Sequence, residues 1–155
     1  KILTDHREEE VVAMAAISLS RARVMIRKTF ETGKEMGLNP LSAVVLDAGG
    51  HVIAFERQDG ASPGRFQIAQ GKAYGAVMLG MPGSAQMARA EAQAYFIAAA
   101  NGAFGGQMIP VPGGVLVKDS KGRVMGALGV TGDSSDNDAT AAKAGVEAAG
   151  LVAEV

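Results

Sequence analysis

The chain has 155 residues, of which 48% are hydrophobic and 20% are charged, and its formal net charge is −1. This length is enough for one domain with its own hydrophobic core, but not for two. The near-neutral charge and the 5% aromatic content argue against nucleic-acid binding and against attraction to an anionic membrane. Because the chain contains no cysteine, disulfides, thiolate metal sites and cysteine nucleophiles are excluded.

Residues 1–17 are expected to be an extension or arm, followed by a single domain over residues 18–155. The acidic run Glu8-Glu9-Glu10 precedes apolar residues and would suit the start of a short helix. No apolar run approaches the roughly 20 residues that span a bilayer, so no membrane partner is expected. We expect a cytoplasmic location. The chain begins at Lys1 and not at methionine, which leaves open an export signal removed from its start.

Helical periodicity predicts a first helix over residues 19–36, with Ser18 or Ser20 as its N-cap. Gly37 and Pro40 fit the end of this helix. The cationic side chains fall between the apolar ones and are assigned to the face away from the core. These cations are Arg21, Arg23, Arg27, Lys28 and Lys34.

A hairpin follows, with strands over residues 42–46 and 51–56 joined by a turn over residues 47–50. Its first strand is continuously apolar, which indicates burial on both faces of a sheet. A second hairpin, with strands over residues 115–118 and 123–130, aligns with the first without gaps. Shared turn chemistry explains the likeness by convergence, and an internal duplication is the alternative.

Between the hairpins, the pattern predicts a helix over residues 65–79 and a third, alanine-rich helix from a Ser84 cap to about residue 95. Residues 104–111 are interpreted as a weak edge strand interrupted by Pro110. The helices contain many small residues, which allow close packing against a sheet or across a subunit boundary.

A last helix is predicted over residues 135–151, with Ser135 and Asp138 in the spacing of a capping box. Asp133 and Asp136 add to the acidic cluster at its start. Complementarity to the helix dipole explains these carboxylates, and the spacing lacks the glycine and the distal glutamate of an EF-hand loop. We therefore expect no metal site.

The candidate site residues begin at the end of the second predicted strand. Arg57 offers a planar fork for a carboxylate or a propionate, and Asp59 is a candidate general base. Lys72 either extends to solvent or reaches a pocket as an anion anchor or as a base of lowered pKa. For Arg57 and Asp59, the alternative is that they belong to a solvated turn with one surface ion pair, which contributes little to stability.

Two glycine-containing segments add backbone donors to this picture. Gly113 and Gly114 precede a predicted strand, and Thr131 follows one, so N–H groups and a hydroxyl are available to an anionic ligand, although tight turns explain them equally well. We predict that Arg57 and Lys72 face a common cavity to which these donors contribute. Asp59 and Lys72 are its candidate catalytic residues.

Five segments, in this order, resemble the GlcG/HbpS family, which also includes the C-terminal domain of PduO-type proteins. They are SAVVLDAGGH at residues 42–51, FERQDG at 55–60, GKAY at 71–74, PGGV at 112–115 and GALGVTG at 126–132. The resemblance implies an α+β fold (α/β in the broad sense) that is profilin-like, with a five-stranded antiparallel sheet and helices on both faces. It also implies a homo-oligomer, an octamer or a smaller assembly.

Some family members bind haem, and others belong among genes of glycolate, diol or aromatic catabolism. The histidine associated with haem in this family precedes the first helix, where this chain has Ala15-Ala16-Ile17. The cofactor therefore stays open, with haem as the candidate. Substitute ligands that the sequence offers are His51, Met108, Lys72 and Tyr74.

From these observations we expect a small-ligand-binding protein that takes haem or a related tetrapyrrole. The alternative is a small catabolic enzyme or accessory factor acting on an oxygenated organic acid, with Arg57, Asp59 and Lys72 at its site. A structural assembly component without a ligand is the third interpretation. The sequence does not decide between an enzyme and a binding protein.

Overall fold

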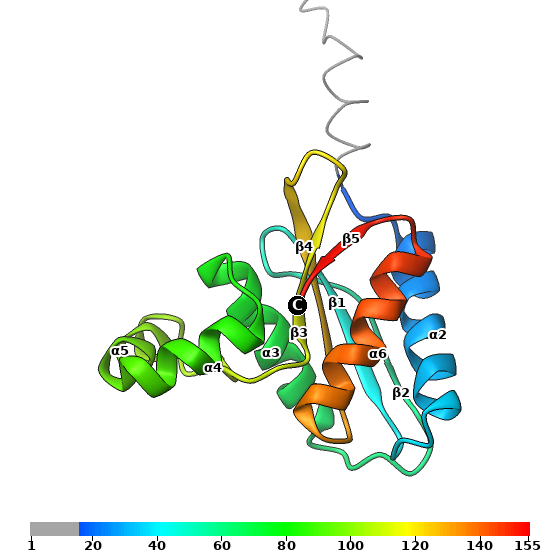
Figure 1. The fold of residues 1–155 in the computed structure, drawn as a ribbon, viewed down its shortest axis with the longest axis horizontal. Coiled ribbons are helices and arrows are strands. Elements are labelled where there is room, and N and C mark those ends of the chain that lie inside the picture. The colour runs from blue at the N-terminus through cyan, green and yellow to red at the C-terminus, as the bar shows by residue number, and fades with distance from the viewer. Residues whose placement is uncertain (1–15) are drawn as a thin grey trace, which may run out of the picture.

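The computed structural model describes residues 16–155, so the predicted acidic helix and most of the predicted N-terminal arm lie outside the described residues. The described chain forms a five-stranded antiparallel sheet in the order β2-β1-β4-β3-β5, with helices on both faces (Figure 1). This confirms the predicted α+β fold. Among residues 16–155, no helix is both long enough and apolar enough to cross a membrane.

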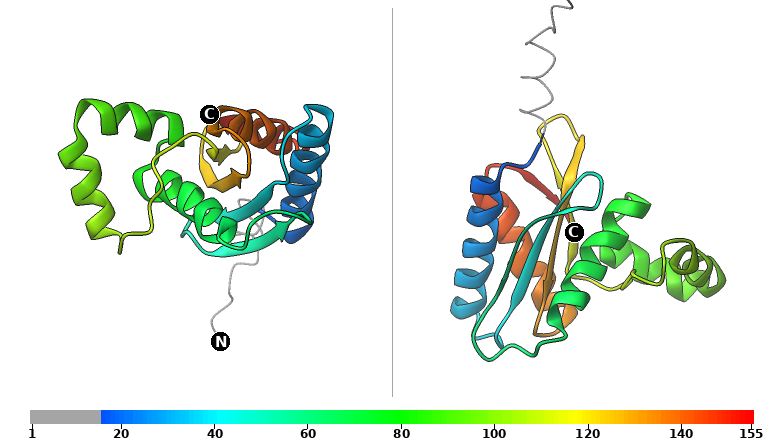
Figure 2. Two further views of the ribbon diagram at one scale, coloured as in Figure 1. Left: turned by 90° about the horizontal axis from the view of Figure 1, so that it is seen from below. Right: turned by 180° about the vertical axis from the view of Figure 1, so that it is seen from behind.

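The helices α2 and α6 lie side by side on one face of the sheet, and α3 covers the other (Figures 1 and 2). The helices are α2 (Leu19–Glu35), α3 (Arg65–Leu79), α4 (Gly83–Ala92), α5 (Ala94–Ala103) and α6 (Ser135–Ala148). The strands are β1 (Ser42–Asp47), β2 (Val52–Arg57), β3 (Gly114–Lys118), β4 (Val124–Thr131) and β5 (Val152–Glu154).

Successive side chains of a strand point to opposite faces, and the sheet buries an apolar layer on each. Strand residues in the layer under α2 and α6 are Ala43, Val45, Val115, Val117, Leu128 and Val130. Those in the layer under α3 are Val44, Leu46, Leu116 and Ala127. The continuous apolar run of β1 is thus buried on both sides, as predicted.

The helix α2 begins where the sequence predicts. Ser18 is its N-cap, and its Oγ accepts the backbone N–H of Arg21 at 3.1 Å. Gly37, with φ +70°, follows the end of the helix in the left-handed region that glycine favours. Leu19, the first residue of the helix, is 48% exposed and lines the space between α2 and β2.

The two hairpins share their turn geometry. Asp47 Oδ1 accepts the backbone N–H groups two and four residues ahead, at 2.9 and 3.0 Å, and Asp119 Oδ1 does the same at the same distances. Gly50 and Gly122 occupy equivalent turn positions with φ +85° and +79°. The likeness between the hairpins therefore extends from their sequences to their hydrogen bonds.

The prediction of an edge strand over residues 104–111 is wrong, because these residues form no strand and return as irregular chain from α5 to β3. The Ile109 N–H donates to the Gly71 carbonyl of α3 at 3.1 Å, and the Met108 N–H donates to Asn101 Oδ1 at 2.9 Å. A helix carbonyl and a side chain thus satisfy backbone groups that a sheet partner would otherwise satisfy.

The fifth strand is instead β5, which pairs antiparallel with β3. The helix α6 ends at Ala148, earlier than predicted, because Gly150 with φ +75° turns the chain into this strand. The cap also differs from the prediction. Ser134 is the N-cap, with its Oγ accepting the Asn137 N–H at 3.3 Å. Asp138 is buried, and its carboxylate accepts hydrogen bonds from Lys72 Nζ and from the Asp133 N–H.

The third predicted helix corresponds to α4, but its N-cap is Pro82 and not Ser84, which lies inside the helix. A further helix that was not predicted, α5, follows after Gln93, whose φ of −142° and ψ of 67° break the helical path. Together they project away from the sheet, and we call them the α4–α5 arm (residues 83–103; Figures 1 and 2). The Arg89 guanidinium lies 4.4 Å from the ring centroid of Phe96, which links the two helices.

Candidate ligand-binding groove

An open groove of about 1140 Å³ runs between α2 and the edge strand β2. Its α2 side is a stripe of residues at three- and four-residue steps, which therefore share one face of the helix. The lining residues on α2 are Leu19, Ser20, Arg23, Val24, Arg27, Phe30, Glu31 and Lys34. Those on or just after β2 are Ile53, Ala54, Phe55, Glu56 and Gln58.

The groove combines apolar surface with cations. Phe30 and Ile53 are half-buried and supply the apolar surface, whereas the ring of Phe55 packs on Phe66 of α3 on the other face of the sheet. Arg23, Arg27 and Lys34 are exposed along the helix side, and Glu31 and Glu56 are the acids of the lining. Apolar walls with a few charged groups are typical of small-molecule sites, and guanidinium groups bind carboxylates in bidentate fashion.

A second pocket of about 500 Å³ continues the groove beyond the last turn of α2. It shares Phe30, Lys34 and Gln58 with the groove and adds Arg57 and Asp59. Its other lining residues are Gly33, Leu38 and Pro40. The structure therefore brings Arg57 and Asp59 to one pocket, together with Lys34, which the sequence did not single out.

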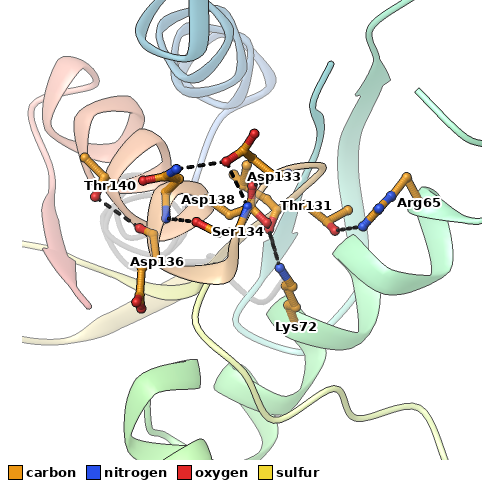
Figure 3. Close-up of polar contacts among 10 residues, drawn as sticks. Arg65, Lys72, Thr131, Asp133, Ser134, Asp136, Asp138 and Thr140 are labelled. Atoms are coloured by element: carbon orange, nitrogen blue, oxygen red, sulfur yellow. Dashed lines mark hydrogen bonds and ion pairs between the residues drawn. The ribbon is translucent and has the colours of Figure 1, made fainter. Parts of the chain in front are cut away.

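Lys72 lies elsewhere, in the interior of the domain. Its side chain is 3% exposed, and its Nζ donates to Asp138 Oδ2 and to the Val130 carbonyl, each at 3.0 Å (Figure 3). Asp138 Oδ1 in turn accepts the Asp133 N–H at 3.0 Å. Burial lowers the pKa of Lys72, and the Asp138 carboxylate opposes this shift. Lys72 thus ties α3 to β4 and to the start of α6.

Thr131, Gly113 and Gly114 lie around this buried lysine and not around Arg57. Thr131 Oγ1 accepts a hydrogen bond from Arg65 Nη1 at 2.9 Å (Figure 3). A Cβ on Gly113 would stand 2.9 Å from Lys72 Nζ, and a Cβ on Gly114 would collide with the Lys72 carbonyl oxygen. In the described chain these glycines make room for α3.

The six candidate site residues therefore lie at two separate places. Arg57 and Asp59 line the pocket beside α2, whereas Lys72 is enclosed between α3 and α6. The predicted cavity shared by Arg57 and Lys72 is not formed by a single chain, because the ammonium of Lys72 is directed to Asp138. No group of three or more histidine or acidic residues that could hold a metal ion occurs within residues 16–155.

Sequence reasoning missed the cations of α2 as site residues. Arg23, Arg27 and Lys34 were assigned to the solvent face, which is correct for their exposure but not for their surroundings. Their spacing places them on the same face as Leu19 and Phe30, and this mixture of apolar and cationic residues on one stripe was the available indication of a groove.

Fold and groove together define a small α+β domain with an open groove beside an edge strand. The chain belongs to the HbpS-like family, described as haem degrading protein HbpS-like, whose model matches residues 17–147. The family is thus one related to haem.

Several solved structures share this fold. The PduOC:Heme complex is similar with a TM-score of 0.78 at 20% identity, covering 88% of this chain and 96% of that chain. A double mutant of Streptomyces reticuli HbpS gives 0.72 at 27% identity, covering 85% and 86%. The Klebsiella pneumoniae protein ORFY gives 0.75 at 24% identity, covering 86% and 90%. No curated protein sequence matches this chain.

Proposed function

We propose that this protein binds haem or a related tetrapyrrole in the groove between α2 and β2. The observation that carries the proposal is the composition of the groove, in which apolar surface is flanked by Arg23, Arg27 and Lys34. A tetrapyrrole has the matching chemistry, a flat apolar ring with carboxylate arms. The haem-related family and the haem complex of a protein with the same fold support this class of ligand.

The residues of the groove fit the ring and its carboxylates better than they fit the iron. The described lining contains no histidine, methionine or tyrosine. His51 is exposed in the first hairpin turn, with its Nδ1 3.3 Å from Asp47 Oδ1. Binding is therefore proposed to rest on burial of the ring and on ion pairs with its carboxylates. Haem, when bound, brings the redox chemistry of its iron.

This proposal predicts that hemin and metal-free protoporphyrin IX bind with similar affinity. Changing Arg23→Glu and Arg27→Glu together is expected to weaken both by about tenfold or more, because two attractive charges become repulsive. Absorbance titration measures hemin binding, and quenching of porphyrin fluorescence measures the metal-free ring.

A matched control tests whether the effect is specific to the groove. Arg21→Glu with Lys121→Glu makes the same charge change at exposed positions outside the lining. This control should bind nearly as the parent does. Equal weakening in both double variants would show that only the overall charge matters and would contradict a groove site.

The interpretation as a catabolic enzyme requires Arg57, Asp59 and Lys72 at one site. Arg57 and Asp59 share a pocket, but Lys72 donates to Asp138 and to the Val130 carbonyl inside the domain. The described chain does not assemble the three groups. We therefore propose ligand binding and not catalysis on an organic acid as the function.

We also propose that the protein forms a homo-oligomer through the α4–α5 arm. Ile97 is the one buried residue of α5, while Tyr95 is 73% and Met87 is 37% exposed. An arm with so much exposed apolar surface is typical of an interaction surface, and a second copy of the chain would cover it under closed symmetry.

Light scattering coupled to size-exclusion chromatography is therefore expected to report an oligomer at micromolar concentration. Tyr95→Asp with Met87→Asp should shift the protein to a smaller species, because the charges would be buried at the interface. Thr140→Asp on the exposed face of α6 serves as the control and should leave the mass unchanged. A monomeric parent would contradict the proposal.

A further inference from the structure

We infer that the pocket formed by Lys34, Arg57 and Asp59 is a second carboxylate subsite, so that the preferred ligand is a tetrapyrrole with carboxylate arms on opposite edges of its ring. This inference rests on the proposed function of the groove. It goes further because it names which tetrapyrroles the two ends of the groove distinguish.

The cations of the site stand at two separated places. Arg23 and Arg27 lie in the first half of α2, and Lys34 lies in its last turn. At 1.5 Å per residue, Arg23 and Lys34 are about 16 Å apart along the helix axis. Between these cations along α2 the groove is lined by Phe30, and β2 adds Ile53 on the opposite side. A ligand that uses both ends must carry anions on both sides of an apolar body.

The pocket end has its own preorganised wall. Gln58 Oε1 accepts the Leu41 N–H at 2.7 Å, and the Gln58 N–H donates to the Leu41 carbonyl at 2.9 Å, which fixes this residue beside Arg57. Lys34 and Arg57 provide two positive charges against the single carboxylate of Asp59. The one net positive charge suits one of the two propionates on a ring edge better than a doubly charged phosphate.

Haem and coproporphyrin III differ in whether their carboxylates lie on one edge of the ring or on two. Haem carries both propionates on one edge of the ring, so it can engage the cations at one end only. Coproporphyrin III carries propionates where haem has its two vinyl groups, so it presents carboxylates on opposite edges. The structure therefore favours coproporphyrin III over protoporphyrin IX, both as metal-free rings and as their ferric complexes.

The experiment compares the two rings on the full chain by fluorescence quenching, and their ferric forms by absorbance. We expect coproporphyrin III to bind about tenfold more tightly than protoporphyrin IX. Arg57→Gln should bring the ratio of the two affinities close to one, because it removes the guanidinium group from the second pocket. Arg21→Gln, on the same helix as Lys34 but outside both linings, should keep the parent ratio.

Each result decides something different. Equal affinities for the two rings in the parent would overturn the second subsite and leave the groove proposal standing. A preference for coproporphyrin III that survives Arg57→Gln would also overturn it, because the extra carboxylates would then bind elsewhere. If neither ring binds more tightly to the parent than to the Arg23→Glu, Arg27→Glu variant, both proposals fail.

Discussion

Replacing Lys72 by methionine is expected to lower the free energy of unfolding by about 3–5 kcal/mol. The ammonium of Lys72 stands 3.0 Å from Asp138 Oδ2, and the two side chains are 3% and 1% exposed. Without the lysine, the buried Asp138 carboxylate would lose its ion-pair partner, and the Val130 carbonyl would lose the hydrogen bond from Lys72. Urea denaturation at neutral pH measures the loss.

Two further variants separate the charge effect from a simple loss of packing. Lys143 pairs with Glu147 at 2.9 Å, but both side chains are more than half exposed, so Lys143→Met should cost less than about 1 kcal/mol. Lys72→Met combined with Asp138→Leu should recover much of the stability, since no charge is then left unpaired. Similar losses in Lys72→Met and Lys143→Met would contradict the assignment of a buried ion pair.

The same pair has a consequence at alkaline pH. The pKa of Lys72 is lower in the folded chain than its ordinary value of 10.5, so between these two values the unfolded chain binds more protons. Stability of the parent should therefore gain a contribution that rises with pH across this window. Lys72→Met should lack this contribution.

Replacing Gly129 by alanine is expected to cost about 1–3 kcal/mol and to lower the melting temperature by several degrees. Gly129 lies in β4 directly under α3. An added Cβ would collide with the Ala69 carbonyl oxygen and would stand 2.9 Å from the Ala73 Cβ. The obstacle is helix backbone, so α3 would have to move away from the sheet. Thermal denaturation followed by circular dichroism measures the effect.

Gly102→Ala is the matched control for this prediction. Gly102 lies in α5 with no atom within 4 Å of the position of an added Cβ and with an ordinary backbone conformation. Alanine there should leave stability unchanged or raise it by about 0.4–1 kcal/mol, because it restricts the unfolded chain. A loss at Gly102 equal to that at Gly129 would contradict close approach of α3 as the cause.

The predictable parts of this fold are those with strong local patterns. The apolar stripe of α2 with its Ser18 cap, and α3 between Gly64 and Gly80, follow directly from helix rules, and both hairpins follow from their Asp-to-Gly turns. The strand β5 could not be predicted in this way. It has three residues, and its pairing with β3 depends on where Gly150 directs the chain.

The site was harder to predict than the fold, because the burial of a side chain, and not its residue type, determines whether it lines the groove. Arg57 and Lys72 both looked like anion anchors, and only Arg57 lines a pocket. The deciding partner of Lys72 is Asp138, which is distant in sequence and was interpreted as part of a helix cap. Arg23 and Arg27 were assigned to the face away from the core and not to a site. They line the groove, because β2 places apolar surface beside them.

The α4–α5 arm is attached to the rest of the described chain through few elements. The contacts of α4 are with α5, α3 and β3, whereas α5 packs mainly on α4. Such a unit can open while the sheet stays intact, so its amide hydrogens should exchange by sub-global opening and those of β1 and β4 by global unfolding. If a second copy covers the arm, the helical order of α5 becomes a function of protein concentration, and dilution alone would loosen this part of the molecule.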